Sequence, residues 1–515
     1  MNRARRELIE AIRRSPAADG PRLDAAKWFE QQGDPASVAR AEFIRVQLER
    51  ARLSSHDPAQ HELAARELRL LRQWSAQWAS AHPGLRKISY RRGFAEYAHI
   101  HARTFLPWRK QLFALEPVRD VRLTGLYRPE RSIIEAVARC DEWKHVETLR
   151  FHHQGPHHEP RQELLAILES PKLSNLRALY GTRFQMNAEG RRRIERLSLL
   201  ERLETLAMPS FDTFPDDPGE WFSEGEVDAS GWSALRSFTA PYSYASDELA
   251  RWWGYPWFSE LTSLSCSGDT DSVPALVERL PRGLRSFEGY FNSYRFNERV
   301  ADDLFDRWFD ALIDRPLRAL NLSFNQAEGF DEAFTRALRR APNWSLSQLF
   351  VPQLDADTLT VLADAPSTRH LRSLSATADL AALSLLGQCD GPALETLALA
   401  VPEVDSSVIV RALAAPMARS VSWLTLTGLA LDHALADALC AMEHVAVLRL
   451  QLRSAQPSAI EKLESHFGAR AWLSIERDDE PWPEDEGAQR AILQRDRAAR
   501  APERMPPLDA FVPRL

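Results

Sequence analysis

The stretch PLRALNLSFN (316–325) places leucines at positions 317, 320 and 322 and an asparagine at position 325. Positions 320 and 322 alternate as in a β-strand, where successive side chains point to opposite faces. The leucine at 317 adds a third apolar side chain just before them. The pattern Leu-x-x-Leu-x-Leu therefore predicts a short strand with one buried face.

The same pattern recurs along most of the chain. If the first apolar residue of a copy is position 1, then positions 1, 4 and 6 are apolar or glycine. The first positions of successive copies are separated by 23 to 33 residues, about 27 on average. The copies are VRDVRLTG (118–125), VETLRFHH (146–153), LRALYGT (176–182), LETLAMP (203–209), LRSFTAP (235–241), LTSLSCS (261–267), LRSFEGY (284–290), LRALNLS (317–323), LSQLFVP (346–352), LRSLSAT (371–377), LETLALA (394–400), VSWLTLT (421–427), VAVLRLQ (445–451) and a degenerate WLSIE (472–476).

This average spacing is typical of leucine-rich repeats. Stretches between copies, such as DDLFDRWFDALI (302–313) and SVIVRALAA (407–415), carry apolar residues at helical spacing. Stacked copies would align their strands into one parallel sheet over a continuous core. The sequence predicts an α/β leucine-rich-repeat solenoid of about 13–14 repeats over residues 86–475, with strands on the concave face and helices on the convex face. Only one copy carries the asparagine, whose side chain normally satisfies backbone groups at the turn. At the remaining turns we expect other groups to form these hydrogen bonds.

Residues 1–85 lack the repeat and read as helices. The segments LDAAKWFEQQGDP (23–35) and RAEFIRVQLERARL (40–53) resemble the bacterial repeat-companion domain, a helical module found ahead of repeats. RRGFAEYAHI (91–100) and LFALEPVRDVRLT (112–124) resemble its junction with the repeats. The resemblance implies a bacterial leucine-rich-repeat protein with a small all-α N-terminal domain and no catalytic activity. Because terminal repeats need a cap, capping is one role for this module, and independent binding is the other.

The composition describes a globular protein, with 44% hydrophobic and 27% charged residues. A formal net charge of -7 gives no sign of a nucleic-acid-binding protein. We expect no membrane span, because no run of 18 apolar residues occurs. We expect a cytoplasmic protein, because MNRARRELIEAIRR lacks the apolar core of a signal peptide. We also expect a monomer. The isolated cysteines predict buried reduced thiols, at Cys140, Cys266, Cys389 and Cys440.

The sequence contains no nucleophile elbow and no glycine-rich phosphate loop. The histidines in FHHQGPHHEP (151–160) lack a paired HExxH or CxxC motif, and Gly155-Pro156 marks a turn. We interpret this stretch as a polar loop. We therefore expect neither an enzyme nor a bound cofactor or metal.

Two surfaces are candidates for binding a protein partner. Positions 3, 5 and 7 of each copy should point out of the concave sheet, and Trp, Tyr and Arg dominate binding hot spots. On that face the candidates are Arg122, Arg150, Tyr180, Trp423 and Arg449. In the connections 242–258 and 290–298 they are Tyr242, Tyr244, Trp252, Trp253, Tyr290, Phe291 and Tyr294. The alternative for the tryptophans, including Trp257, is packing behind the sheet.

The acidic segment 211–232 contains proline and glycine and predicts a surface loop, either a cleavage site or a tolerated insertion. The tail 476–515 is expected to be partly disordered or docked. The sequence favours a non-enzymatic protein–protein interaction scaffold with a partner of unknown identity. The alternative is a regulated component of a bacterial stress or defence pathway, such as a protease substrate cut in an exposed loop, which would make a protease the partner.

Overall fold

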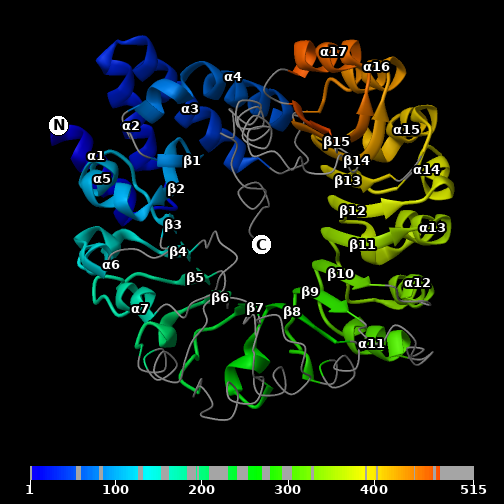
Figure 1. Cartoon of the computed structure of the whole chain (residues 1–515), viewed down its shortest axis with the longest axis horizontal. Coiled ribbons are helices and arrows are strands. Elements are labelled where there is room, and N and C mark those ends of the chain that lie inside the picture. The colour runs from blue at the N-terminus through cyan, green and yellow to red at the C-terminus, as the bar shows by residue number, and fades with distance from the viewer. Residues whose placement is uncertain are drawn as a thin grey trace, which may run out of the picture. The chain divides into compact units, whose positions relative to one another are not determined.

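The computed structural model describes residues 3–53, 59–80, 85–125, 131–151, 162–181, 193, 197–207, 230–239, 253–269, 276, 279–292, 304–325, 330–388, 391–401, 404–445, 447–467 and 471–475. The chain forms two compact units, one of Met1–Leu235 with Pro481–Leu515 and one of Arg236–Glu480. Both units combine parallel strands with helices, so the fold is α/β as predicted (Figure 1). The domain boundary that we predicted at residue 85 stays a prediction.

The first unit begins with helices and continues into a sheet. Its strands are hydrogen-bonded in chain order, antiparallel between β1 and β2 and parallel in the described pairs from β2 to β6. Its elements are α1 (Arg3–Arg14), α2 (Gly20–Gln32), α3 (Pro35–Arg52), α4 (Ala59–Ser80), β1 (Leu85–Arg91), β2 (Phe94–His101), α5 (Ala102–Leu115), β3 (Asp120–Thr124), α6 (Arg131–Ala138), η1 (Asp141–His145), β4 (Thr148–Phe151), α7 (Gln162–Leu168), β5 (Ala178–Gly181), η2 (Leu200–Arg202) and β6 (Thr205–Ala207).

The second unit repeats a strand and a helix or short 3-10 turn. Its strands pair in chain order and in parallel. Helices α11 to α17 follow one another on one side of these strands (Figure 1). The elements are β7 (Ser237–Thr239), η3 (Pro256–Glu260), β8 (Ser263–Asp269), β9 (Ser286–Asn292), α11 (Leu304–Ile313), β10 (Ala319–Asn325), α12 (Phe330–Arg340), β11 (Gln348–Leu354), α13 (Ala356–Asp364), η5 (Pro366–Thr368), β12 (Ser373–Ala378), α14 (Leu380–Leu386), β13 (Thr396–Ala400), α15 (Ser406–Leu413), η6 (Pro416–Ala418), β14 (Trp423–Leu431), α16 (His433–Ala441), β15 (Val447–Ala455), α17 (Pro457–Phe467) and β16 (Ala471–Ile475).

Among the described residues, positions 1, 4 and 6 of the repeat lie in the core, as the pattern predicts. In the opening motif Leu317, Leu320 and Leu322 are at most 1% exposed. Burial of a leucine side chain contributes about 2 kcal/mol, so each copy adds several kcal/mol only when its neighbours cover it. In β12 the odd positions are half-exposed and the even positions are buried. The odd positions therefore point to the sheet face opposite the helices.

A backbone hydrogen-bond pattern sets the register between copies. The carbonyl oxygen of Arg119 accepts from the N–H groups of Glu147 and Thr148, at 2.8 and 3.0 Å. The carbonyl oxygen of Arg372 accepts in the same way from Glu395 and Thr396, at 2.7 and 2.9 Å. The carbonyl oxygen at position 2 of one copy thus accepts hydrogen bonds from positions 2 and 3 of the next copy. Equivalent side chains therefore lie in straight rows across the strands.

Aspartates satisfy the helix N-termini in the later part of the second unit. The carboxylates of Asp355, Asp379 and Asp432 each accept from the backbone N–H three residues on, at 2.7 to 2.8 Å. Asp405 accepts from the Ser407 N–H at 2.7 Å. N-cap aspartates satisfy otherwise unpaired helix donors. They supply partners at turns that lack the asparagine of the opening motif.

The N-terminal helices share a core with the first two strands. One cluster joins Ile12, Phe29 and Ile44 to Phe94 of β2, and a second packs Phe43 of α3 against Trp78 and Tyr90. The hairpin turns on Arg92 and Gly93, both at positive φ (49° and 86°), as two-residue hairpin loops favour.

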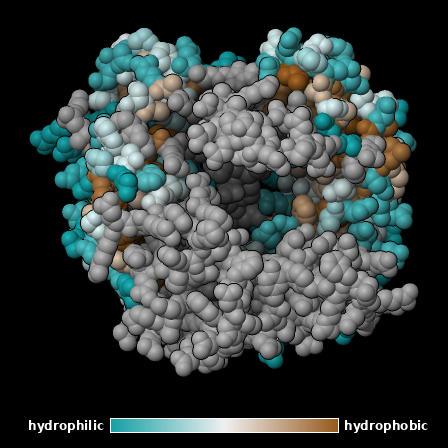
Figure 2. Space-filling view, viewed as in Figure 1, coloured by the Kyte–Doolittle hydropathy of each residue, from teal (hydrophilic) through white to brown (hydrophobic). Residues whose placement is uncertain are grey.

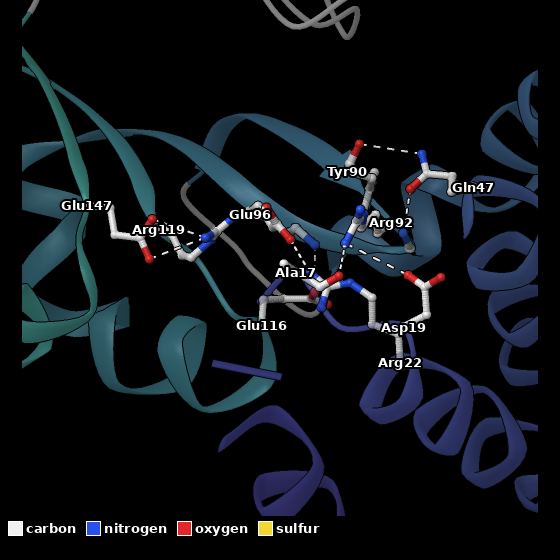
Figure 3. A network of polar contacts seen from close by, with 12 residues as sticks. Ala17, Asp19, Arg22, Gln47, Tyr90, Arg92, Glu96, Glu116, Arg119 and Glu147 are labelled. Atoms are coloured by element: carbon white, nitrogen blue, oxygen red, sulfur yellow. Dashed lines mark hydrogen bonds and ion pairs between the residues drawn. The ribbon is translucent and has the colours of Figure 1, made fainter. Parts of the chain in front are cut away.

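A buried polar network also ties these helices to the sheet, and Figure 3 shows part of it. Arg22 is fully buried and pairs with Glu96, which also pairs with Arg119 at 2.7 Å. Arg119 pairs in turn with Glu147 at 3.1 Å. The network therefore runs from α2 through β2 to the residues that precede β3 and β4.

A second buried pair lies beside it. Arg40 of α3 donates to both carboxylate oxygens of Glu116 at 3.1 Å, and Glu116 also accepts from the Ala95 N–H at 2.8 Å. The guanidinium of Arg40 lies 4.6 Å from the ring centre of Tyr90 and 4.9 Å from that of Trp78. Helix α3 is thus fixed on β2 by charge pairing as well as by apolar packing.

Candidate functional site

The structure brings three of the predicted residues into one row on the first unit. Arg122 of β3 pairs in register with Arg150 of β4, and Arg150 pairs with Tyr180 of β5. All three side chains are half-exposed. They occupy position 5 of successive copies, on the sheet face opposite the helices. We call this row, with the residues added below, the arginine row.

Arg150 is held on two sides. Its Nε and Nη2 atoms donate to the carboxylate of Asp120 at 3.0 to 3.2 Å. Its guanidinium lies 4.1 Å from the ring centre of Tyr180. The side chains of Arg150 and Asp120 are only 19% and 18% exposed, so this pair is less screened than a surface pair.

Two members of the row escaped the sequence analysis. His99 of β2 pairs in register with Arg122, and Tyr97 pairs with Asp120. Burial raises the pKa of the Tyr97 hydroxyl, while the charge of Arg122 and a hydrogen bond with it oppose this rise. The hydroxyl therefore stays protonated at neutral pH and can donate a hydrogen bond.

The missed signal is a further copy of the repeat within RRGFAEYAHI. Ala95, Ala98 and Ile100 occupy positions 1, 4 and 6, and all are fully buried. Alanines weaken the leucine pattern, so the sequence alone favours a junction here.

In the second unit, Trp423 and Arg449 lie on neighbouring strands. Trp423 of β14 pairs in register with Val447, and Arg449 of β15 pairs with Thr425. Trp423 is half-buried and Arg449 is exposed, so they are diagonal neighbours on one face. The sequence analysis also missed Phe350 of β11, a half-exposed side chain in register with Ser375 of β12.

The predicted aromatic surface of the connections is mostly outside the described residues. Tyr242, Tyr244, Trp252 and Tyr294 all lie outside the described part of the chain. Tyr290 and Phe291 lie on β9, in register with Ser323 and Phe324 of β10. Trp253 is half-buried.

Trp257 follows the alternative interpretation, because it is 2% exposed and packs on Phe238 at 5.2 Å between ring centres.

The histidines at 152–158 also lie outside the described residues. Among the residues that the structure describes, no group of three His, Cys, Asp or Glu side chains could hold a metal ion. None of the described helices combines the length and apolarity that a bilayer span needs.

Two described cysteines confirm the expectation of buried thiols. Cys140 and Cys266 are buried, and burial raises their pKa to about 11 and about 12. Both therefore stay protonated at neutral pH and are poor nucleophiles. Cys440 is half-buried, and Cys389 lies outside the described residues.

Comparison of the chain with protein-family models and with curated proteins finds no match.

Proposed function

We propose that this chain is a non-enzymatic protein-binding scaffold of the leucine-rich-repeat type, built as a solenoid. The arginine row is the observation that carries this proposal. It presents arginine and tyrosine, the residues favoured at binding hot spots, on a sheet face opposite the helices. The repeat spacing, the chain-order parallel strands and the buried leucine rows support the repeat type.

We also propose that helices α1 to α4 belong to a bacterial repeat-companion module that caps the array. The shared cores around Phe94 and Tyr90 and the buried Arg22–Glu96 pair support capping. An independent binding module would not need buried charges paired across to the sheet. Because β1 is antiparallel and ends the parallel order, we include this strand in the cap with the helices.

The surface composition favours a polar mode of recognition. In the view of Figure 2, hydrophilic residues predominate and hydrophobic ones lie in small separate groups among the described residues. Val38 and Leu380 are the large apolar side chains that stand out, at 43% and 56% exposed. Large exposed apolar patches mark hydrophobic docking sites. Because the hydrophobic groups in this view are small and separate, we favour the arginine row as the binding surface.

Affinity capture from the source cells tests the scaffold. The full chain is immobilised, and bound proteins are identified by mass spectrometry. The proteins bound by the wild type are compared with those bound by two variants. One carries Arg122→Ala and Tyr180→Ala, and the other, Arg139→Ala, is a control on the helical side. We expect at least one protein to bind the wild type and the control but not the double variant. Recovery of nothing above blank resin would contradict the scaffold.

The narrower alternative, a protease substrate in a stress or defence pathway, stays a prediction from the sequence of 211–232. Residues 211–229 lie outside the described part of the chain. Limited proteolysis tests it, since resistance of this segment would argue against cleavage. Cytoplasmic location and a monomeric state are likewise proposals.

A further inference from the structure

Among the described residues, the arginine row carries one positive charge more than its carboxylates compensate. Arg122 and Arg150 are register partners on adjacent strands, where backbones lie about 4.8 Å apart, and like charges at this spacing repel. The carboxylate of Asp120 is engaged by Arg150. In the described part of the chain, no ion pair joins Arg122 to a carboxylate. Two guanidinium groups and one carboxylate leave an excess of one positive charge, at Arg122.

The groups around Arg122 are already positioned. Asp120 and the ring of Tyr180 hold Arg150 in place. On the other side Tyr97 presents its hydroxyl, held partly buried in the next strand. Binding at such a site immobilises few additional side chains, which lowers its entropic cost.

We propose that Arg122, together with Tyr97 and Arg150, binds one carboxylate of an extended acidic segment of the protein partner. This inference rests on the proposed function and names the chemistry of the partner. The planar guanidinium matches the two oxygens of a carboxylate. An excess of one positive charge matches a carboxylate better than a phosphate group, which carries about −1.5 to −2.

The neighbouring strands leave room for the segment to continue. Beyond Tyr180 this sheet face continues with Thr205 and Ala207 of β6, which are half-exposed, and with Ala178 of β5, which is buried. These side chains are small and project little from the sheet. The partner segment therefore places its acidic residue at Arg122 and the following residues over β5 and β6.

Peptide binding by the full chain tests this proposal. The probes are fluorescein-labelled ten-residue peptides of alternating Glu and Ala, their Gln–Ala counterparts and their phosphoserine–Ala counterparts, measured by fluorescence anisotropy in 0.05 M NaCl. We expect the Glu–Ala peptide to bind and the Gln–Ala peptide not to bind. Arg122→Gln should weaken binding about tenfold or more, because a charge-assisted hydrogen bond is lost.

Arg139→Gln is the matched control. Arg139 follows α6 on the helical side, its side chain is 78% exposed, and the substitution removes the same charge. We expect this variant to bind within about twofold of the wild type. Arg122→Lys keeps the charge without the planar fork and should fall between wild type and Arg122→Gln. Thermal unfolding checks that each variant is folded.

Asp120→Asn provides a test in the opposite direction. It removes the charge that compensates Arg150, while the amide oxygen of asparagine still accepts from Arg150 and the ring of Tyr180 still packs on it, so Arg150 stays in place. The excess charge rises, and the Glu–Ala peptide should bind several-fold more tightly. A merely structural role of Asp120 predicts weaker binding instead.

Three results would overturn the proposal: no binding of the Glu–Ala peptide, equal binding by Arg122→Gln, or Asp120→Asn binding more weakly than the wild type. Arg122-dependent binding of the phosphoserine peptide about tenfold more tightly than the Glu–Ala peptide would overturn the choice of a carboxylate. Captured proteins that bind Arg122→Gln and wild type equally would also overturn it, yet leave the scaffold intact. Capture of no protein contradicts the scaffold itself, whatever the peptides do.

Discussion

The buried pair between Arg40 and Glu116 offers the sharpest test of how the N-terminal helices are attached. Both side chains are 4% exposed, and the carboxylate accepts from Arg40 and from the Ala95 N–H. Substitution of Glu116 by glutamine keeps the size but leaves the Arg40 charge buried without its counter-charge. Breaking a buried ion pair in this way costs about 3–5 kcal/mol. We expect about 3 kcal/mol, because the amide oxygen of glutamine still accepts one hydrogen bond.

The matched control is Glu30→Gln. Glu30 pairs with Arg45 in the same unit, but the two side chains are 44% and 42% exposed. Exposed pairs contribute about 0 to 1 kcal/mol, so the same chemical change should have little effect there.

Native-state hydrogen exchange of α3 and β2 amides measures the opening free energy of this region directly. A loss of about 3 kcal/mol raises exchange rates about a hundredfold, since every 1.4 kcal/mol is a factor of ten. Arg40→Met should also destabilise. The double variant Arg40→Met/Glu116→Gln should cost less than the sum of the single variants, because Arg40 no longer lies buried without its counter-charge. Arg5, which also pairs with Glu116 at 3.7 Å, loses this partner equally in the single and the double variant. Equal exchange in Glu116→Gln and Glu30→Gln would refute the reasoning.

Three further predictions concern stability. Burial and then a neighbouring aspartate raise the pKa of Asp331 to about 6, so the folded state holds this proton more tightly and stability falls as pH rises from about 4 to about 6. Asp331→Asn should therefore raise the free energy of unfolding by about 1 kcal/mol at pH 7 and leave it unchanged at pH 3.5; a pH-independent effect would contradict this. Asp432→Ala removes the N-cap of α16 and should lower stability by about 1 kcal/mol in thermal unfolding, whereas Asp432→Asn should lower it less. Gly93→Ala should destabilise the hairpin by about 2 kcal/mol or more, because the φ of Gly93 is 86° and an added Cβ would clash with Ile44. Hydrogen exchange of the β1 amides measures this loss, and exchange rates equal to those of the wild type would contradict the clash.

The repeat itself could be predicted because its information is local. Apolar residues at positions 1, 4 and 6 specify a strand with one buried face, and their regular spacing specifies stacking of equivalent strands. Leu320 and Leu374 were therefore assigned correctly to the core, and Arg122, Arg150 and Tyr180 to the open face. These assignments need no knowledge of distant contacts.

The partners of those side chains depended on the tertiary structure. The register between copies is set after connections of unequal length, so the pairing of Arg150 with Asp120, 30 residues earlier, was not visible in either copy alone. Arg22 and Glu96 are 74 residues apart and belong to a helix and a strand with no shared pattern. The strand that contains Tyr97 and His99 was missed because buried alanines replaced the leucines of the motif.

The sequence by itself determined that strands and helices alternate and which side chains they bury, because burial follows a short periodic pattern. Only the tertiary structure decided which charges meet and how the N-terminal helices are attached to the sheet. Charge pairing depends on distances of a few ångströms between residues far apart in the chain, and periodicity contains no information about those distances.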